Sequence, residues 1–173
     1  MEDINEICAE YCIENYTINP DGSIDVNGDV YLLDNELTEL PLAFNKVTGY
    51  FDCGKNKLTT LKGSPRWVGR YFSCNNNQLT SLEFSPDYVG GYFICDDNQL
   101  TSLEFGPDYV GDDFYCEGNY LTDNYCDSEI SGDFYTSLKQ DGLIIDGYNK
   151  ATNYNEWRKL YKRKKILDDI FNM

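Results

Sequence analysis

The chain has 173 residues, of which 41% are hydrophobic and 25% charged, and its formal net charge is −16 at pH 7. This length fits one domain that buries about 70% of the surface of its unfolded chain. The absence of histidine excludes Ser-His and Cys-His nucleophiles and most zinc sites, and the negative charge disfavours nucleic acid and anionic lipid as partners.

Residues 1–25 are predicted to form an N-terminal cap that consists of a helix and a hairpin. Apolar residues recur with helical spacing over residues 3–14, and Asp3 and Glu6 have the spacing of a capping box. The apolar face of this helix is formed by Ile4, Ile7, Cys8, Tyr11 and Cys12. A strand–turn–strand pattern follows at residues 16–26. Such a cap would cover the open end of the repeats that follow it.

The opening residues also bear on the location of the protein. They are acidic and lack the basic region and the long apolar run of a signal peptide. No segment of the chain approaches the roughly 20 apolar residues that are needed to span a bilayer. We therefore expect a soluble, cytoplasmic protein.

A repeat of about 21 residues fills residues 26–136, and a fixed period of this length is typical of stacked-repeat folds. Four positions recur in it: Val30, Phe51, Phe72, Phe93 and Phe114; then Leu32, Cys53, Cys74, Cys95 and Cys116; then Asn35, Asn56, Asn77, Asn98 and Asn119; then Leu37, Leu58, Leu79, Leu100 and Leu121. Phe-x-Cys has strand periodicity, so both side chains are expected in the core. The Asn should turn the chain and form a hydrogen-bonded ladder with its copies.

Four of the seven cysteines share one column of the repeat, and no Cys-x-x-Cys pair occurs. A buried free cysteine behaves as a small apolar residue. We therefore expect core thiols, with no bound metal and no cofactor.

The order apolar-x-apolar/Cys-x-x-Asn-x-Leu-x-x-Leu resembles the leucine-rich repeat. The repeat length and a proline near the back of each copy (Pro65, Pro86, Pro107) resemble the short bacterial version, which uses extended chain on its convex side. The motif Val-Gly-x-Tyr-Phe-x-Cys…Asn-x-Leu-Thr-Ser-Leu-Glu is similar to that of repeat proteins of large tailed phages. The resemblance implies a mainly β, right-handed leucine-rich-repeat-like solenoid of about five repeats. It implies no activity.

Residues 137–173 are predicted to form a C-terminal cap. A sixth copy begins at residues 130–136, but Lys139 replaces the Asn, and a different element begins at residues 143–145. A basic amphipathic helix is expected from about 154 to 171. Residues 156–173 carry six basic and three acidic side chains, or +3, whereas residues 1–155 carry eight and twenty-seven, or −19. The helix either covers the last coil or acts as a basic arm that contacts nucleic acid or the acidic body.

The residues that alternate with the core positions are expected on the concave strand face. They give a tyrosine stripe flanked by acidic residues, and aromatic side chains are favoured at protein interfaces. The predicted partner-binding residues are Tyr31, Tyr50, Tyr71, Tyr92, Ile94, Asp96, Asp97, Tyr115 and Glu117. The alternative is that the tyrosines only stabilise neighbouring strands. A second aromatic set, Trp67, Tyr88 and Tyr109, lies on the loop or convex side, where Phe84 and Phe105 are expected to fill the core.

The sequence shows no catalytic set. Asp96 with Asp97, or Asp112 with Asp113, could supply paired carboxylates, but adjacent strand residues face opposite ways. We therefore expect a non-enzymatic, acidic protein-binding module whose partner has a basic surface. The phage resemblance implies a host protein as that partner, such as a defence or nucleic-acid-binding protein inhibited in the host cytoplasm. The alternatives are a structural component of the virion and a carboxylate-based hydrolase.

Overall fold

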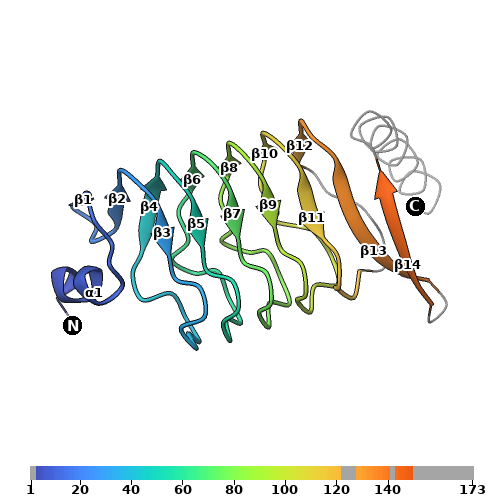
Figure 1. Cartoon of the computed structure of the whole chain (residues 1–173), viewed down its shortest axis with the longest axis horizontal. Coiled ribbons are helices and arrows are strands. Elements are labelled where there is room, and N and C mark those ends of the chain that lie inside the picture. The colour runs from blue at the N-terminus through green and yellow to red at the C-terminus, as the bar shows by residue number, and fades with distance from the viewer. Residues whose placement is uncertain (1–2, 122–127, 141–142, 150–173) are drawn as a thin grey trace, which may run out of the picture.

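The computed structural model describes residues 3–121, 128–140 and 143–149, which form a mainly β solenoid of about five turns (Figure 1). One short helix, α1 (Ile4–Glu10), precedes the coils. The predicted C-terminal helix lies outside the described residues.

Each coil contributes a short strand to each of two seven-stranded sheets. Sheet A contains, in spatial order, β1 (Tyr16–Ile18), β2 (Ile24–Val26), β4 (Phe44–Val47), β6 (Trp67–Val68), β8 (Tyr88–Val89), β10 (Tyr109–Val110) and β12 (Glu129–Ile130). Sheet B contains β3 (Val30–Tyr31), β5 (Phe51–Asp52), β7 (Phe72–Ser73), β9 (Phe93–Ile94), β11 (Phe114–Cys116), β13 (Phe134–Gln140) and β14 (Leu143–Asn149). Neighbouring strands are parallel except in two pairs, β1–β2 and β13–β14. The repeat length fixes the register, because Phe72 pairs with Phe51 on one side and Phe93 on the other.

The core is a set of columns that run from coil to coil between the two sheets. The phenylalanines of sheet B are fully buried, and successive rings lie 4.9–5.5 Å apart: Phe51, Phe72, Phe93, Phe114 and Phe134. Sheet A supplies one buried valine per coil at Val47, Val68, Val89 and Val110. Burial of this apolar surface is the main source of stability. The predicted core columns are confirmed.

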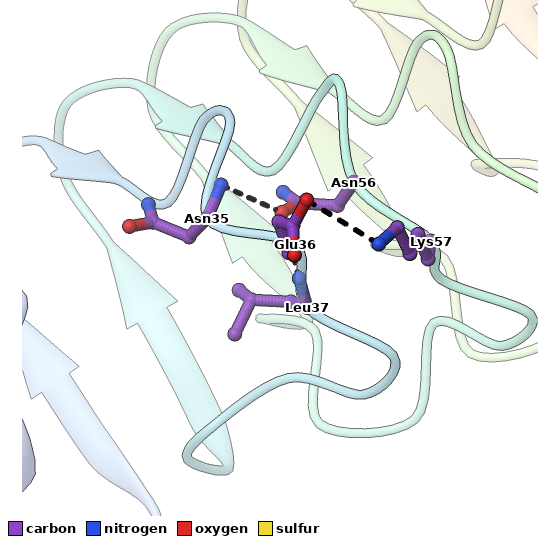
Figure 2. Close-up of polar contacts among 5 residues, drawn as sticks. All are labelled: Asn35, Glu36, Leu37, Asn56 and Lys57. Carbon is purple, nitrogen blue, oxygen red and sulfur yellow. Dashed lines mark hydrogen bonds and ion pairs between the residues drawn. The ribbon is translucent and has the colours of Figure 1, made fainter.

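The asparagine ladder is confirmed too. Asn77 Nδ2 donates to the carbonyls of Cys53 and Cys74 at 3.0 and 3.1 Å, and its Oδ1 accepts from Leu58 N at 2.9 Å. Figure 2 shows the first step of the ladder, where Asn56 Oδ1 accepts from the backbone of Asn35 and of Leu37. One side chain therefore satisfies backbone groups of two coils that the corner would otherwise leave unpaired.

The cysteine column is part of the core. Cys53, Cys74, Cys95 and Cys116 are fully buried thiols, and burial raises the pKa of Cys53 and Cys74 far above the ordinary range. The described residues contain no group of three His, Cys, Asp or Glu side chains that could hold a metal ion. These four cysteines pack inside the core, where Cys53, Cys95 and Cys116 also donate Sγ–H to a carbonyl of the next coil.

The N-terminal helix is shorter than the sequence indicates. Asp3 caps it by accepting from Asn5 N at 3.0 Å, but the helix ends at Glu10 and Cys12 has a φ of 53°. The expectation that Cys12 lies on the buried face is wrong, because this left-handed residue turns out of the helix and is exposed. The predicted hairpin is present as β1 and β2.

The sixth copy ends as the sequence indicates. Phe134 and Thr136 of β13 pair with Phe114 and Cys116, which continues the ladder of sheet B. The chain then reverses, and β14 pairs with β13 in the antiparallel direction. None of the helices among the described residues has the length and apolar character to cross a membrane.

Candidate protein-binding surface

The outer face of sheet B carries a row of tyrosines that we call the tyrosine strip: Tyr31, Tyr50, Tyr71, Tyr92, Tyr115 and Tyr135. Tyr50, Tyr71 and Tyr92 directly precede the buried phenylalanine of their strand. Tyr31, Tyr115 and Tyr135 directly follow the first core residue of theirs. Both positions alternate with core residues, so the sequence predicts that both face outward. Tyr31 and Tyr92 are 54% and 40% exposed, whereas the other four are partly buried. Ile94 of β9, also among the predicted contact residues, is partly buried beside them.

Ring contacts between coils join the members of the strip in two groups, Tyr50 with Tyr71 and Tyr92 with Tyr115 and Tyr135. Tyr50 stacks on Tyr71 with ring centroids 4.4 Å apart, and Tyr115 stacks on Tyr135 at 4.5 Å. Tyr92 meets Tyr115 edge to face at 6.1 Å. These contacts stabilise the sheet, as the alternative interpretation of the tyrosines requires. They also fix the rings before any partner arrives, which lowers the entropy lost on binding.

Carboxylates line the strip and are fixed by the backbone of the next coil. Asp29 Oδ1 accepts from Tyr50 N at 2.8 Å. Asp113 accepts from Asp133 N at 2.6 Å with one oxygen and from the Tyr115 hydroxyl at 2.9 Å with the other. The acidic residues among the aromatic rings are therefore ordered parts of the surface.

Nearby carboxylates and partial burial raise the pKa of two tyrosines of the strip, Tyr71 and Tyr92. Burial, followed by the charge of Asp52, raises the pKa of Tyr71 to about 12. The charge of Asp112, followed by burial, raises the pKa of Tyr92. Tyr71 and Tyr92 therefore offer neutral rings with hydroxyl groups inside a negative field.

Arg70 adds a positive charge that the sequence interpretation missed. Its Nη1 donates to the Tyr50 hydroxyl at 2.9 Å, and its guanidinium lies 5.1 Å from the centre of that ring. The sequence did carry a sign of it, because the equivalent position in the coils before and after is glycine (Gly49 and Gly91), and a long basic side chain stands out there. Tyr135 was missed because the sixth copy of the repeat departs from the consensus sequence. Its strand still alternates inward and outward residues, and Tyr135 pairs with Tyr115.

The predicted acidic residues Asp96, Asp97 and Glu117 lie in the corners that follow β9 and β11. Asp96 Oδ1 accepts from Glu117 N at 2.7 Å, and partial burial raises the pKa of Asp96 to about 6. Asp97 and Glu117 are exposed. The structure thus gives Asp96 a role in joining coils and leaves the other two available to a partner.

The second aromatic set forms a row on the outer face of sheet A. Trp67, Tyr88 and Tyr109 stack face to face with ring centroids 5.5 and 5.1 Å apart, and Lys46 Nζ lies 4.7 Å from the centre of the Trp67 ring. Most faces of these rings are therefore already in contact with a neighbouring ring or with Lys46, which leaves little ring surface for a partner.

The expectation that Phe84 and Phe105 fill the core is wrong. The leucines two positions earlier, Leu82 and Leu103, take the inside positions with at most 1% exposure. Phe84 and Phe105 follow in the turns and are 51% and 61% exposed.

The fold and its outer faces define a class of protein: a β solenoid whose repeated coils display ordered aromatic and acidic side chains. Comparison of the chain with family models, with curated proteins and with solved structures gives no match. The resemblance to leucine-rich repeats and to phage repeat proteins therefore stays a prediction.

Proposed function

We propose that the protein is a non-enzymatic binding module whose tyrosine strip and neighbouring carboxylates bind a partner protein with a basic surface. The observation that carries the proposal is the tyrosine strip itself, in which Tyr50 stacks on Tyr71, and the more exposed Tyr92 contacts Tyr115, which stacks on Tyr135. Tyrosine gives large contact area with few torsions to fix, so such a strip is suited to recognition.

The charge supports a basic partner. The chain carries 30 acidic and 14 basic side chains. Two ion pairs join described residues to one another, Lys57–Glu36 at 3.4 Å and Arg66–Asp87 at 3.4 Å (Figure 2 shows the first). Most acidic side chains are thus left to produce a negative field, which attracts a basic surface and speeds association.

Carboxylates around aromatic rings resemble what a single-stranded nucleic acid presents to its binding groove, namely phosphates and stacked bases. A protein with this surface can occupy such a groove and block it. The likeness of the repeats to phage proteins supports a host protein as the target, and the host cytoplasm as the place where the protein acts.

The test begins with affinity capture from host lysate by the full chain, followed by kinetics with the purified partner. Tyr92→Ala should raise the dissociation rate by about tenfold, because it removes an exposed anchor. Tyr88→Ala is the matched control: it removes a comparably exposed ring from sheet A, where we expect no change. Association should slow as salt is raised.

Two results would contradict the proposal. One is full affinity of Tyr31→Ala/Tyr92→Ala, with loss of binding in a folded chain that ends near residue 155; that pattern would place the site in the basic C-terminal segment. The other is an association rate that does not depend on salt. Self-association in place of a captured partner would favour a structural role.

A further inference from the structure

The turns that precede β6, β8 and β10 of sheet A have the same backbone in three successive coils. They span residues 61–64, 82–85 and 103–106, and the N–H of the last residue donates to the carbonyl of the first at 2.9, 2.9 and 3.2 Å. The third residue has a positive φ each time: 98° at Gly63, 69° at Phe84 and 65° at Phe105. Position three of such a turn favours glycine.

Phenylalanine is unfavourable at this position for two reasons. A bulky side chain with positive φ is strained. The side chain also gains little from burial, since Phe105 is the most exposed of the large hydrophobic residues in the described chain. Neither the turn nor the core accounts for phenylalanine here, and it is present in two adjacent coils. Contact with another molecule would account for it.

The two rings line an open groove of about 390 Å³. Its other walls include Glu83, Asp87 and Asp108 as acidic residues, against Arg66 as the basic one. Arg66 is paired with Asp87 at 3.4 Å, and no described residue forms an ion pair with Glu83 or Asp108. The groove therefore combines apolar rings with uncompensated negative charge.

Ser64 adds an independent sign of a ligand. It lines the groove, the residue as a whole is 9% exposed, and its buried hydroxyl has no hydrogen-bond partner among the described residues. The equivalent Ser85 donates to the Phe105 carbonyl at 2.7 Å. Buried hydroxyls are rarely left unpaired, and a serine needs to turn about only one torsion to meet an incoming group.

We propose that this phenylalanine groove (Ser64, Glu83, Phe84, Phe105 and Asp108) binds a segment of a partner protein that carries Lys or Arg beside an apolar side chain. The apolar side chain lies against Phe84 and Phe105, the basic group faces Glu83 and Asp108, and the peptide backbone hydrogen-bonds to Ser64. The groove shares no residue with the tyrosine strip, so the two binding proposals can be tested independently of each other.

The probe is a displayed library of random 12-residue peptides, selected on the full chain and counter-selected on Phe84→Gly/Phe105→Gly. Glycine already occupies this turn position at residue 63, so the double variant should fold, with Tm within about 3 °C of the parent. We expect selected peptides with Lys or Arg near Leu, Met, Phe or Trp. A synthetic consensus peptide should bind the double variant at least about tenfold more weakly.

Further variants separate this groove from the strip and guard against a folding defect. Glu83→Gln/Asp108→Asn, at exposed positions, should weaken the peptide a few-fold and remove most of its salt dependence. Tyr31→Ala/Tyr92→Ala should bind the peptide normally. Equal binding to the parent and the glycine variant, or an acidic consensus, would overturn the proposal. Parent dimers that the glycine variant cannot form would also overturn it, because a second copy would then be the occupant.

Discussion

The corner that follows β3, β5, β7, β9 and β11 of sheet B and the turn that precedes β6, β8 and β10 of sheet A both reverse the chain, but by different means. At the first, an asparagine side chain supplies the hydrogen bonds, as Asn77 does for two coils. At the second, the backbone closes the turn by itself, and the third residue is Gly63, Phe84 or Phe105. The asparagine recurs from coil to coil because its side chain makes these bonds, whereas a side chain that the turn does not use is available for binding.

The largest expected effect is at the asparagine corner. Asn77→Ala should lower the free energy of unfolding by about 3 kcal/mol, because it leaves the Leu58 N–H unpaired and removes one of the two amide hydrogen bonds that the carbonyl groups of Cys53 and Cys74 each accept. Urea denaturation measures the change. The control is Gln78→Ala at the exposed next position, which should change stability by less than about 0.5 kcal/mol. Equal effects of the two variants would break the comparison.

At the turn before sheet A, the backbone should be the sensitive part. Gly63→Ala should cost about 2 kcal/mol, because a Cβ there would lie 2.8 Å from the Leu42 carbonyl oxygen and the φ is 98°. Thermal and urea unfolding of the two proteins measure this change. A neutral result would mean that the turn tolerates side chains generally, and the two phenylalanines would then need no special explanation.

The asparagine corner also contains one position that varies, and Asp96 occupies it. Burial raises the pKa of Asp96 from 3.8 to about 6, so the folded protein binds this proton more tightly than the unfolded chain does. The resulting stability is complete below about pH 4 and is lost as the pH rises through 6. Asp96→Asn, which keeps an acceptor for Glu117 N, should therefore be about 1 kcal/mol more stable than the parent at pH 7 and equal to it near pH 4.

Unfolding measured from pH 4 to pH 8 tests this dependence on Asp96. Asp34→Asn, at an exposed position in the same corner three coils away, is the control and should change stability by less than about 0.5 kcal/mol. A destabilised Asp96→Asn at pH 7 would show that the negative charge, and not only the acceptor atom, holds Glu117 in place.

The smallest effect is expected for Phe84→Gly. Relief of the strained φ of 69° offsets the greater freedom that glycine gives the unfolded chain, and the net change should be below about 1 kcal/mol. Calorimetry of the single variant gives the number. A loss of several kcal/mol would mean that Phe84 supports the fold after all.

The sequence predicted the solenoid because its repeat places the same side chain in the same column every coil. Phe72 and Cys74 alternate as strand residues do, and Asn77 follows at the corner, so local pattern and global packing agree. The same logic misplaced Phe84, since an apolar residue that recurs with the repeat is normally a core residue. Its exposure depends on a backbone dihedral that periodicity does not encode.

The position of the tyrosines on the outer face of sheet B was also predicted from the repeat, but their contacts were not. Alternation placed Tyr50, Tyr71 and Tyr92 outside, but it could not show that Tyr50 and Tyr71 stack. It also could not show that Arg70 reaches the Tyr50 hydroxyl, because that contact joins neighbouring coils. Contacts between coils depend on rotamers, and a one-dimensional pattern carries no information on them.

The two antiparallel strands have a consequence for assembly. A stack of parallel coils has no inherent length, because each new edge is a template for one more coil of the same kind. Here β1 reverses the direction at one end of sheet A, and β14 does so at the opposite end of sheet B (Figure 1). A second molecule that docked end to end would meet a strand running the wrong way at each of these edges. The reversals thus work as terminators, and they oppose growth of the coil stack into fibres.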